Sequence, residues 1–191
     1  VTDQGRPSNC KEERMEISKD HLSAEARWAI STKGLTTALA AHLNAIYNFT
    51  GKTKYAELLR PIWAQIGQAS AQMAREFQMQ ADDATSMAAT GAAICTYVMG
   101  PELRIEEVEA SPERTVLKVV ECPWWNRMND LGISRDLLTA CDAAFWDHFV
   151  RSLTSNVSMK HGKQMHRGDP YCEWIFEAKR ANEKRGRYAF G

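Results

Sequence analysis

The spacing of apolar residues changes near residue 100, and this change constrains the fold more than any other feature. Over residues 23–99 the apolar side chains recur every three to four positions, as in amphipathic helices. Over residues 103–119 they alternate with polar residues, as in strands with one buried face. A helical block followed by a strand block in a chain of 191 residues predicts an α+β fold around one core.

The helical block predicts three helices, over residues 23–49, 52–80 and 84–99. Thr50-Gly51 separates the first two, and Pro61 predicts a kink or a late start in the second. Gly100-Pro101 ends the third, which is rich in alanine and would suit an interface between two copies of the chain, a homodimer.

The strand block predicts two β-hairpins. The first has strands around residues 103–105 and 115–119, and the second has strands over residues 156–166 and 171–178, joined by the turn-forming residues 167–170. Between them we expect a short helix over residues 125–131 and a longer one over 135–153. The prediction is therefore long N-terminal helices packed on an antiparallel four-stranded sheet of two hairpins with an intervening helix.

The domain organisation follows from the polar ends of the chain. Residues 1–22 form a polar N-terminal tail, residues 23–178 a single α+β domain, and residues 179–191 a basic C-terminal tail. The first twenty residues lack the apolar segment of a secretory signal, so we expect a cytoplasmic protein.

Charge and motifs exclude several function classes. The 24 Lys and Arg balance 24 Asp and Glu, and basic residues do not cluster with aromatics, so we expect no nucleic-acid partner. No apolar run is long enough to cross a membrane. Dinucleotide, P-loop, zincin and hydrolase-elbow motifs are absent. The five cysteines do not occur in the closely spaced pairs typical of structural metal sites, so no cofactor or metal is implied. The expected partner is a small molecule.

The predicted helix over residues 135–153 presents the first cluster of reactive residues. Cys141, Phe145 and His148 stand at i, i+4 and i+7, so they share one face. Asp142 projects about 100° from Cys141 and can reach a neighbouring wall. The alternative is a core stripe in which Cys141 is a small apolar residue and His148 is hydrogen-bonded.

The second hairpin presents another candidate. Counting outward from its turn predicts three pairs: His166 with Tyr171, Met165 with Cys172, and His161 with Phe176. This register turns His161 toward the apolar face that carries Cys172 and Trp174. The alternatives are a core histidine bonded to backbone, or a one-residue slip that exposes His161.

The end of the second strand, Glu121-Cys122-Pro123-Trp124-Trp125, brings a carboxylate, a thiol and two indoles together. This composition suits the rim of a pocket. The alternative has the two indoles packed against a helix and Glu121 in water.

Three segments resemble the L-2-amino-thiazoline-4-carboxylic acid hydrolase family: residues 118–124 with their Cys-Pro-Trp element, Cys141-Asp142 in a helix, and residues 168–176 with a Gly-Asp-Pro-Tyr-Cys turn. The C-terminal half is also similar to the 4-vinyl-reductase-like ligand-binding fold. The first resemblance implies that water opens a small ring containing sulfur and nitrogen.

That chemistry requires a nucleophile or activated water together with an acid or base. The catalytic candidates are Cys141 or Cys122 as nucleophile or water-positioning thiol, His161 or His148 as general base, and Asp142 or Glu121 as the group that orients it. The binding candidates are Trp124, Trp125, Phe145, Trp146, Cys172 and Trp174. Because burial raises the pKa of a thiol, a reactive cysteine would need a cationic neighbour.

Two other functions remain open. The same thiols and aromatics can enclose a small ligand in a binding module that breaks no bond. The pocket can also act as a lyase or isomerase on another small cyclic compound, since a fold does not fix the reaction.

Overall fold

The computed structural model describes residues 22–180, without the side chains of residues 136–141. Its elements are α1 (Ala24–Glu76), α2 (Ala84–Met99), β1 (Arg104–Ala110), β2 (Arg114–Glu121), α3 (Pro123–Asp130), α4 (Asp136–Leu153), β3 (Val157–His161), the 3-10 turn η2 (Met165–Arg167) and β4 (Cys172–Ala178). The strands form one antiparallel sheet in the order β1-β2-β4-β3. The predicted α+β fold, with two hairpins and a helix between them, is confirmed.

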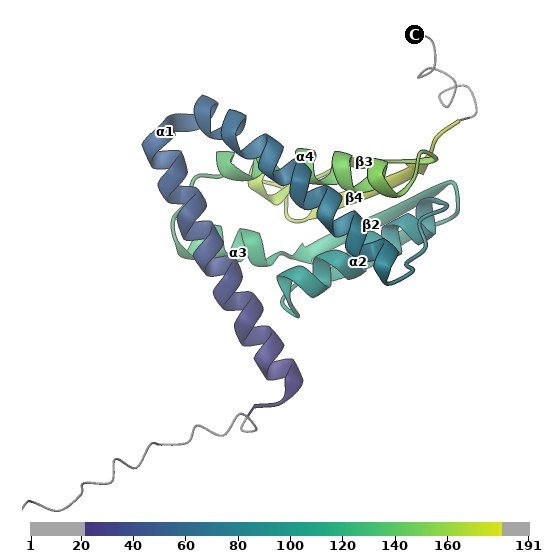
Figure 1. Ribbon diagram of the computed structural model, residues 1–191, viewed down its shortest axis with the longest axis horizontal. Coiled ribbons are helices and arrows are strands. Elements are labelled where there is room, and N and C mark those ends of the chain that lie inside the picture. Colours follow the sequence, from purple (N-terminus) through teal and green to yellow (C-terminus); the bar gives the residue numbers. More distant parts are fainter. Residues whose placement is uncertain (1–21, 181–191) are drawn as a thin grey trace, which may run out of the picture.

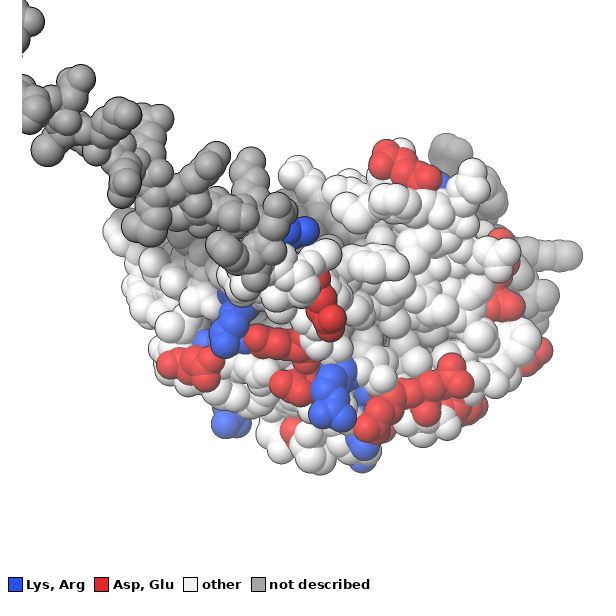
Figure 2. Space-filling view, turned by 90° about the horizontal axis from the view of Figure 1, so that it is seen from below, with Lys and Arg blue, Asp and Glu red and all other residues white. Residues whose placement is uncertain are grey.

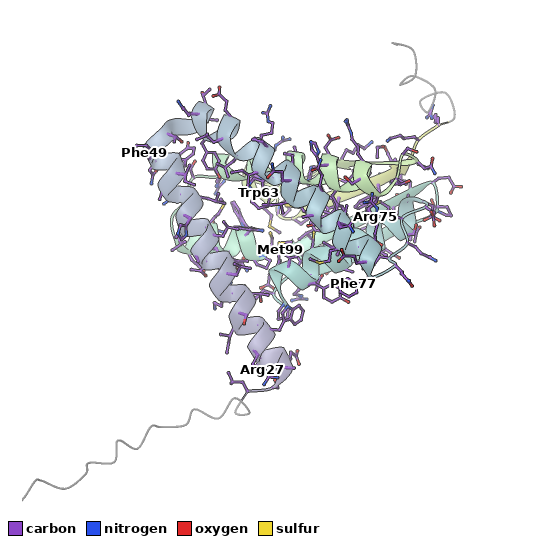
Figure 3. All side chains as sticks on the ribbon, in the orientation of Figure 1. Arg27, Phe49, Trp63, Arg75, Phe77 and Met99 are labelled. Carbon is purple, nitrogen blue, oxygen red and sulfur yellow. The ribbon has the colours of Figure 1, made fainter. Side chains whose placement is uncertain are left out.

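The long element α1 is two helices joined at Gly51, where the backbone adopts φ 74° and ψ 167°. A positive φ is open to glycine without steric cost, so the break falls at this residue. The two parts, residues 24–50 and 52–76, correspond to the first two predicted helices. Pro61 lies inside the second part and does not end it. Phe49 marks the bend between the two parts (Figure 3).

The helices cover one face of the sheet. The second part of α1 packs along α4, and α4 and α2 lie on the sheet (Figure 1). Trp146 of α4 has its ring centre 4.8 Å from that of Trp174 and 5.7 Å from that of Phe176, both on β4. The opposite face carries ion pairs such as Lys160 with Glu177 at 2.7 Å, as expected of a face in water.

The alanine-rich helix α2 uses its apolar face within the chain, since Met87, Ala88 and Ile94 are each at most 1% exposed. Its buried side therefore does not supply the expected surface for pairing two copies. Large exposed apolar side chains lie on both helices: Tyr97 and Val98 near the end of α2, and several on α1, including Phe49, which is 92% exposed. Acidic and basic side chains are interspersed along one margin of Figure 2, next to a wide uncharged area. Among the described residues, no helix is long and apolar enough to cross a membrane.

Candidate functional site

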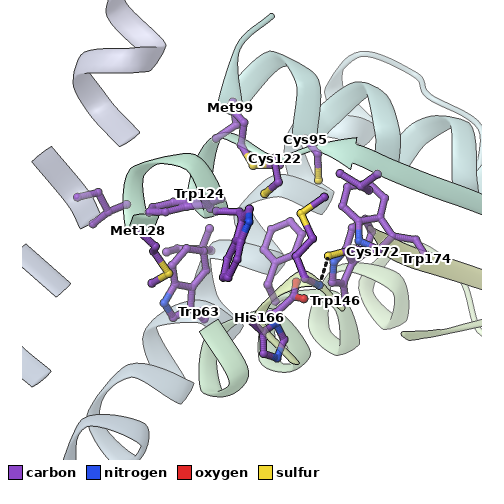
Figure 4. Close-up of a pocket in the computed structure, with 18 of the residues that line it drawn as sticks. Trp63, Cys95, Met99, Cys122, Trp124, Met128, Trp146, His166, Cys172 and Trp174 are labelled. Carbon is purple, nitrogen blue, oxygen red and sulfur yellow. Dashed lines mark hydrogen bonds between the residues drawn. The ribbon is translucent and has the colours of Figure 1, made fainter. Parts of the chain in front are cut away.

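A cavity of about 190 Å³ lies where the four helices, the η2 turn and the sheet meet. Its wall contains all six binding candidates: Trp124, Trp125, Phe145, Trp146, Cys172 and Trp174. Figure 4 shows Trp63, Trp124 and Met128 at one end and Cys95, Cys172 and Trp174 at the other. A cavity of about 150 Å³ holds benzene in an engineered protein, so this space suits a ligand with one ring.

The Cys-Pro-Trp element places two of these indoles. Cys122 precedes α3 in extended conformation and Pro123 is the first helical residue, where its missing N–H costs nothing. Trp124 and Trp125 therefore fall in the first turn of α3 and reach the cavity wall. Trp124 packs edge-on against Trp63 of α1, with ring centres 5.8 Å apart. The predicted helix over residues 125–131 begins two residues later than α3, because a proline can stand at the first position of a helix as well as between elements.

Asp142 and His161 meet across α4 and β3. The carboxylate of Asp142 lines the cavity, and its Oδ2 lies 2.9 Å from Nε2 of His161, whose side chain is 13% exposed. The contact is close, although it lacks the alignment of a hydrogen bond. His161 itself is not among the cavity-lining residues, so it contacts Asp142 from outside the cavity wall.

The expected pairing of the second hairpin is wrong by two residues. His161 pairs with Trp174, not Phe176, and β3 ends at His161, not at residue 166. A shift of two keeps side chains on the same face, so His161 still points to the apolar side. The physical reason is that the connection is longer than a simple turn, since η2 takes up residues that were expected to extend the strand.

Two bonds hold η2 over the cavity. The backbone N–H of Gln164 donates to Oδ2 of Asp169 at 2.8 Å, and the N–H of Met165 lies 3.3 Å from the acceptor Sγ of Cys172. Asp169 and Cys172 both belong to the Gly-Asp-Pro-Tyr-Cys segment. In this structure the motif therefore fixes the turn that precedes it.

His166, which this turn carries, is the functional candidate that sequence reasoning missed. Its side chain lines the cavity, and its Nε2 is buried without a hydrogen-bond partner among the described residues. Burial lowers the pKa of His166 below its ordinary value, and nearby Asp142 opposes part of that shift. The imidazole is therefore a neutral base at neutral pH. The sequence predicts that residue 166 lies in a strand and pairs with Tyr171. That prediction gives no reason to expect His166 in a cavity wall.

The described thiols at the cavity are neutral. Burial raises the pKa of Cys122 to about 12 and also raises the pKa values of Cys95 and Cys172. All three line the cavity, but none is a thiolate at neutral pH. The side chain of Cys141 lies outside the described residues, so its assignment as a nucleophile stays a prediction.

Two catalytic candidates besides His161 lie outside the cavity wall. His148 faces α1, where its Nδ1 is 3.3 Å from Nε2 of Gln68, because its position on α4 points toward the other helix. Glu121 is 42% exposed, with its carboxylate 4.0 Å from Arg104 of β1. Neither belongs to the cavity wall. Within residues 22–180, excluding the side chains not described, no group of three His, Cys, Asp or Glu side chains is placed to hold a metal.

The fold and the cavity define an α+β protein whose helices and sheet enclose an apolar space with one polar side. The chain belongs to the L-2-amino-thiazoline-4-carboxylic acid hydrolase family, whose model matches residues 28–176. No curated protein sequence matches it.

Solved structures share the fold at low sequence identity. The phenol-responsive sensory domain of the transcription activator PoxR with phenol has 11% identity and a TM-score of 0.51, over 75% of this chain and 74% of that chain. Trafficking protein particle complex subunit 3 from Naegleria fowleri, covalently bound to palmitic acid, has 12% identity and a TM-score of 0.56, over 79% and 96%. At these identities the likeness shows the fold alone.

Proposed function

We propose that this protein is a hydrolase that uses water to open a small ring containing an amidine group, of the 2-amino-thiazoline type. Membership of a family named for such a hydrolase supports the proposal. The observation that carries it is the neutral His166, whose buried Nε2 lacks a hydrogen-bond partner among the described residues, in a cavity wall that also includes Asp142. An unpaired buried nitrogen is satisfied when a water or a ligand enters.

In the proposed reaction, water adds through its oxygen to the amidine carbon while Nε2 of His166 takes one of its protons. The C=N π electrons move to nitrogen as the C–O bond forms. The electron pair of the ring C–S or C–N bond then leaves with sulfur or nitrogen, which receives the proton from His166. The added oxygen becomes the carbonyl at the former amidine carbon, and its remaining proton goes to the nitrogen that took up the π electrons. Relative to the neutral amidine, the reaction consumes one water and no other reactant.

The remaining residues have supporting roles in this scheme. Asp142 holds the amidine, His161 fixes the orientation of Asp142, and the indoles of Trp124 and Trp146 enclose the ring. Cys122 acts as a neutral thiol that positions water, since its raised pKa disfavours attack as a thiolate. Cys141 remains the candidate for a covalent nucleophile.

A binding module without catalysis is the second candidate. It is supported by the apolar cavity and by the raised pKa values of its three described thiols. The two structural neighbours were solved with phenol and with palmitic acid, respectively. Such a module would retain a small ligand through purification and would turn over no cyclic amidine.

The test incubates the purified chain with 2-amino-2-thiazoline or with its 4-carboxylic acid. Mass spectrometry measures the loss of each compound. Catalysed ring opening that His166→Gln reduces by about 10²-fold or more supports the hydrolase. His42→Gln is the matched control, because His42 is exposed on α1. Loss of turnover in Cys141→Ser would add covalent catalysis to the scheme. No turnover, together with a retained ligand, would favour the binding module.

A further inference from the structure

The charged side chain in the described cavity wall is acidic. Among the residues described as lining it, Asp142 is the one carboxylate, and none is lysine or arginine. Residues 136–141, whose side chains are not described, include no lysine or arginine in the sequence. The lining histidine, His166, has a lowered pKa and so adds no positive charge at neutral pH.

Two basic residues near this region are held in ion pairs. Arg127 is 5% exposed and forms ion pairs with Glu102 and, at 3.2 Å, with Asp130. Lys160 pairs with Glu177. None of these cations can neutralise an acidic ligand inside the cavity without breaking its own pair.

Two further basic residues lie beside the site. Arg167 directly follows His166 and acts electrostatically on its imidazole, but it is exposed and does not line the cavity. Arg135 is the other. Its guanidinium lies 5.3 Å from the centre of the Trp125 ring and outside the set of residues that line the cavity. From there it can meet a ligand group that projects out of the cavity.

A carboxylate that enters this space loses its hydration and meets the negative charge of Asp142. A protonated amidine instead gains the attraction of Asp142, and its planar cation can lie against the faces of Trp124, Trp125 or Trp146.

We infer that this protein selects a cationic cyclic amidine without a carboxylate, although its family is named for a carboxylic acid. The inference rests on the proposed function for the identity of the ring, and it concerns the substrate class of that same cavity. Asp142 is the residue that determines this specificity.

Calorimetric titration at neutral pH with three matched probes tests it: 2-amino-2-thiazoline, its 4-carboxylic acid and the neutral 2-methyl-2-thiazoline. We expect the first to bind at least about tenfold more tightly than either of the others. Asp142→Asn should abolish the preference. Asp147→Asn is the matched control, because Asp147 also lies on α4 but pairs with Arg151 outside the cavity.

Equal or tighter binding of the carboxylic acid by the unaltered chain would overturn the inference, whether or not Asp142→Asn folds. An unchanged ranking in a folded Asp142→Asn variant would overturn the role of Asp142. Turnover of a tightly bound carboxylic acid would reject this inference and leave the hydrolase proposal intact. The expected ranking without turnover would support the charge selection and reject the hydrolase.

Discussion

The imidazole of His161 and the carboxylate of Asp142 lie 2.9 Å apart and join the sheet to the helix α4. Asp142 reaches the cavity and His161 does not, so the histidine influences a ligand only through the carboxylate. Asp142 is therefore the residue that can bind a ligand, and His161 is the residue that positions Asp142.

His161→Gln should lower kcat by about 10- to 100-fold, because a small displacement of a group that holds the substrate is costly. Circular dichroism should show an unchanged fold, and steady-state kinetics should place most of the loss in kcat. His42→Gln is again the control. Full activity in His161→Gln would show that Asp142 needs no support from β3.

Asp169→Ala should reduce turnover by releasing η2, since the carboxylate of Asp169 accepts the N–H of Gln164. Asp169→Asn keeps an acceptor oxygen and should retain most of the activity. Comparing kcat for the two variants separates the hydrogen bond from the charge. Equal losses in both variants would mean that the charge of Asp169, not its bond to the turn, is required.

The sequence predicts the elements well because each carries a local signal: helical spacing before residue 100, alternation after it, and Gly51 at the bend of α1. It also predicts the face of α4 that brings Asp142 to a neighbouring wall. His166 was missed because no local pattern distinguishes a strand end from the 3-10 turn. The turn depends on hydrogen bonds that Asp169 and Cys172 accept from backbone N–H groups earlier in the chain. The contact of His148 with α1 could not be predicted because helical spacing does not show which neighbour a face meets.

Cys122 should resist alkylation in the folded protein. Its pKa is raised from 9.0 to about 12, so the thiolate fraction at pH 7.5 is lower by roughly 10³-fold than for a free thiol. Iodoacetamide labelling followed by peptide mass spectrometry, which resolves each cysteine, should show labelling at least tenfold slower than after denaturation. Equal rates before and after denaturation would contradict the buried, neutral thiol.

Gly67→Ala should destabilise the fold by about 1–3 kcal/mol, because an added Cβ would lie 2.4 Å from the carbonyl oxygen of Phe145 on α4. Gly34→Ala is the matched control on α1, with nothing within 4 Å of the added Cβ, and should stabilise by about 0.5–1 kcal/mol. Guanidinium unfolding measures both. A stable Gly67→Ala variant would show that α1 and α4 can move apart.

Ring opening in water enriched in ¹⁸O examines the proposed chemistry most directly. With 2-amino-2-thiazoline, the product should carry one ¹⁸O at the carbonyl formed from the amidine carbon, and His166→Gln should reduce its rate of formation by about 10²-fold or more. Recovery of unchanged 2-amino-2-thiazoline after prolonged incubation with the folded protein would contradict the hydrolase and leave a protein that binds without reaction.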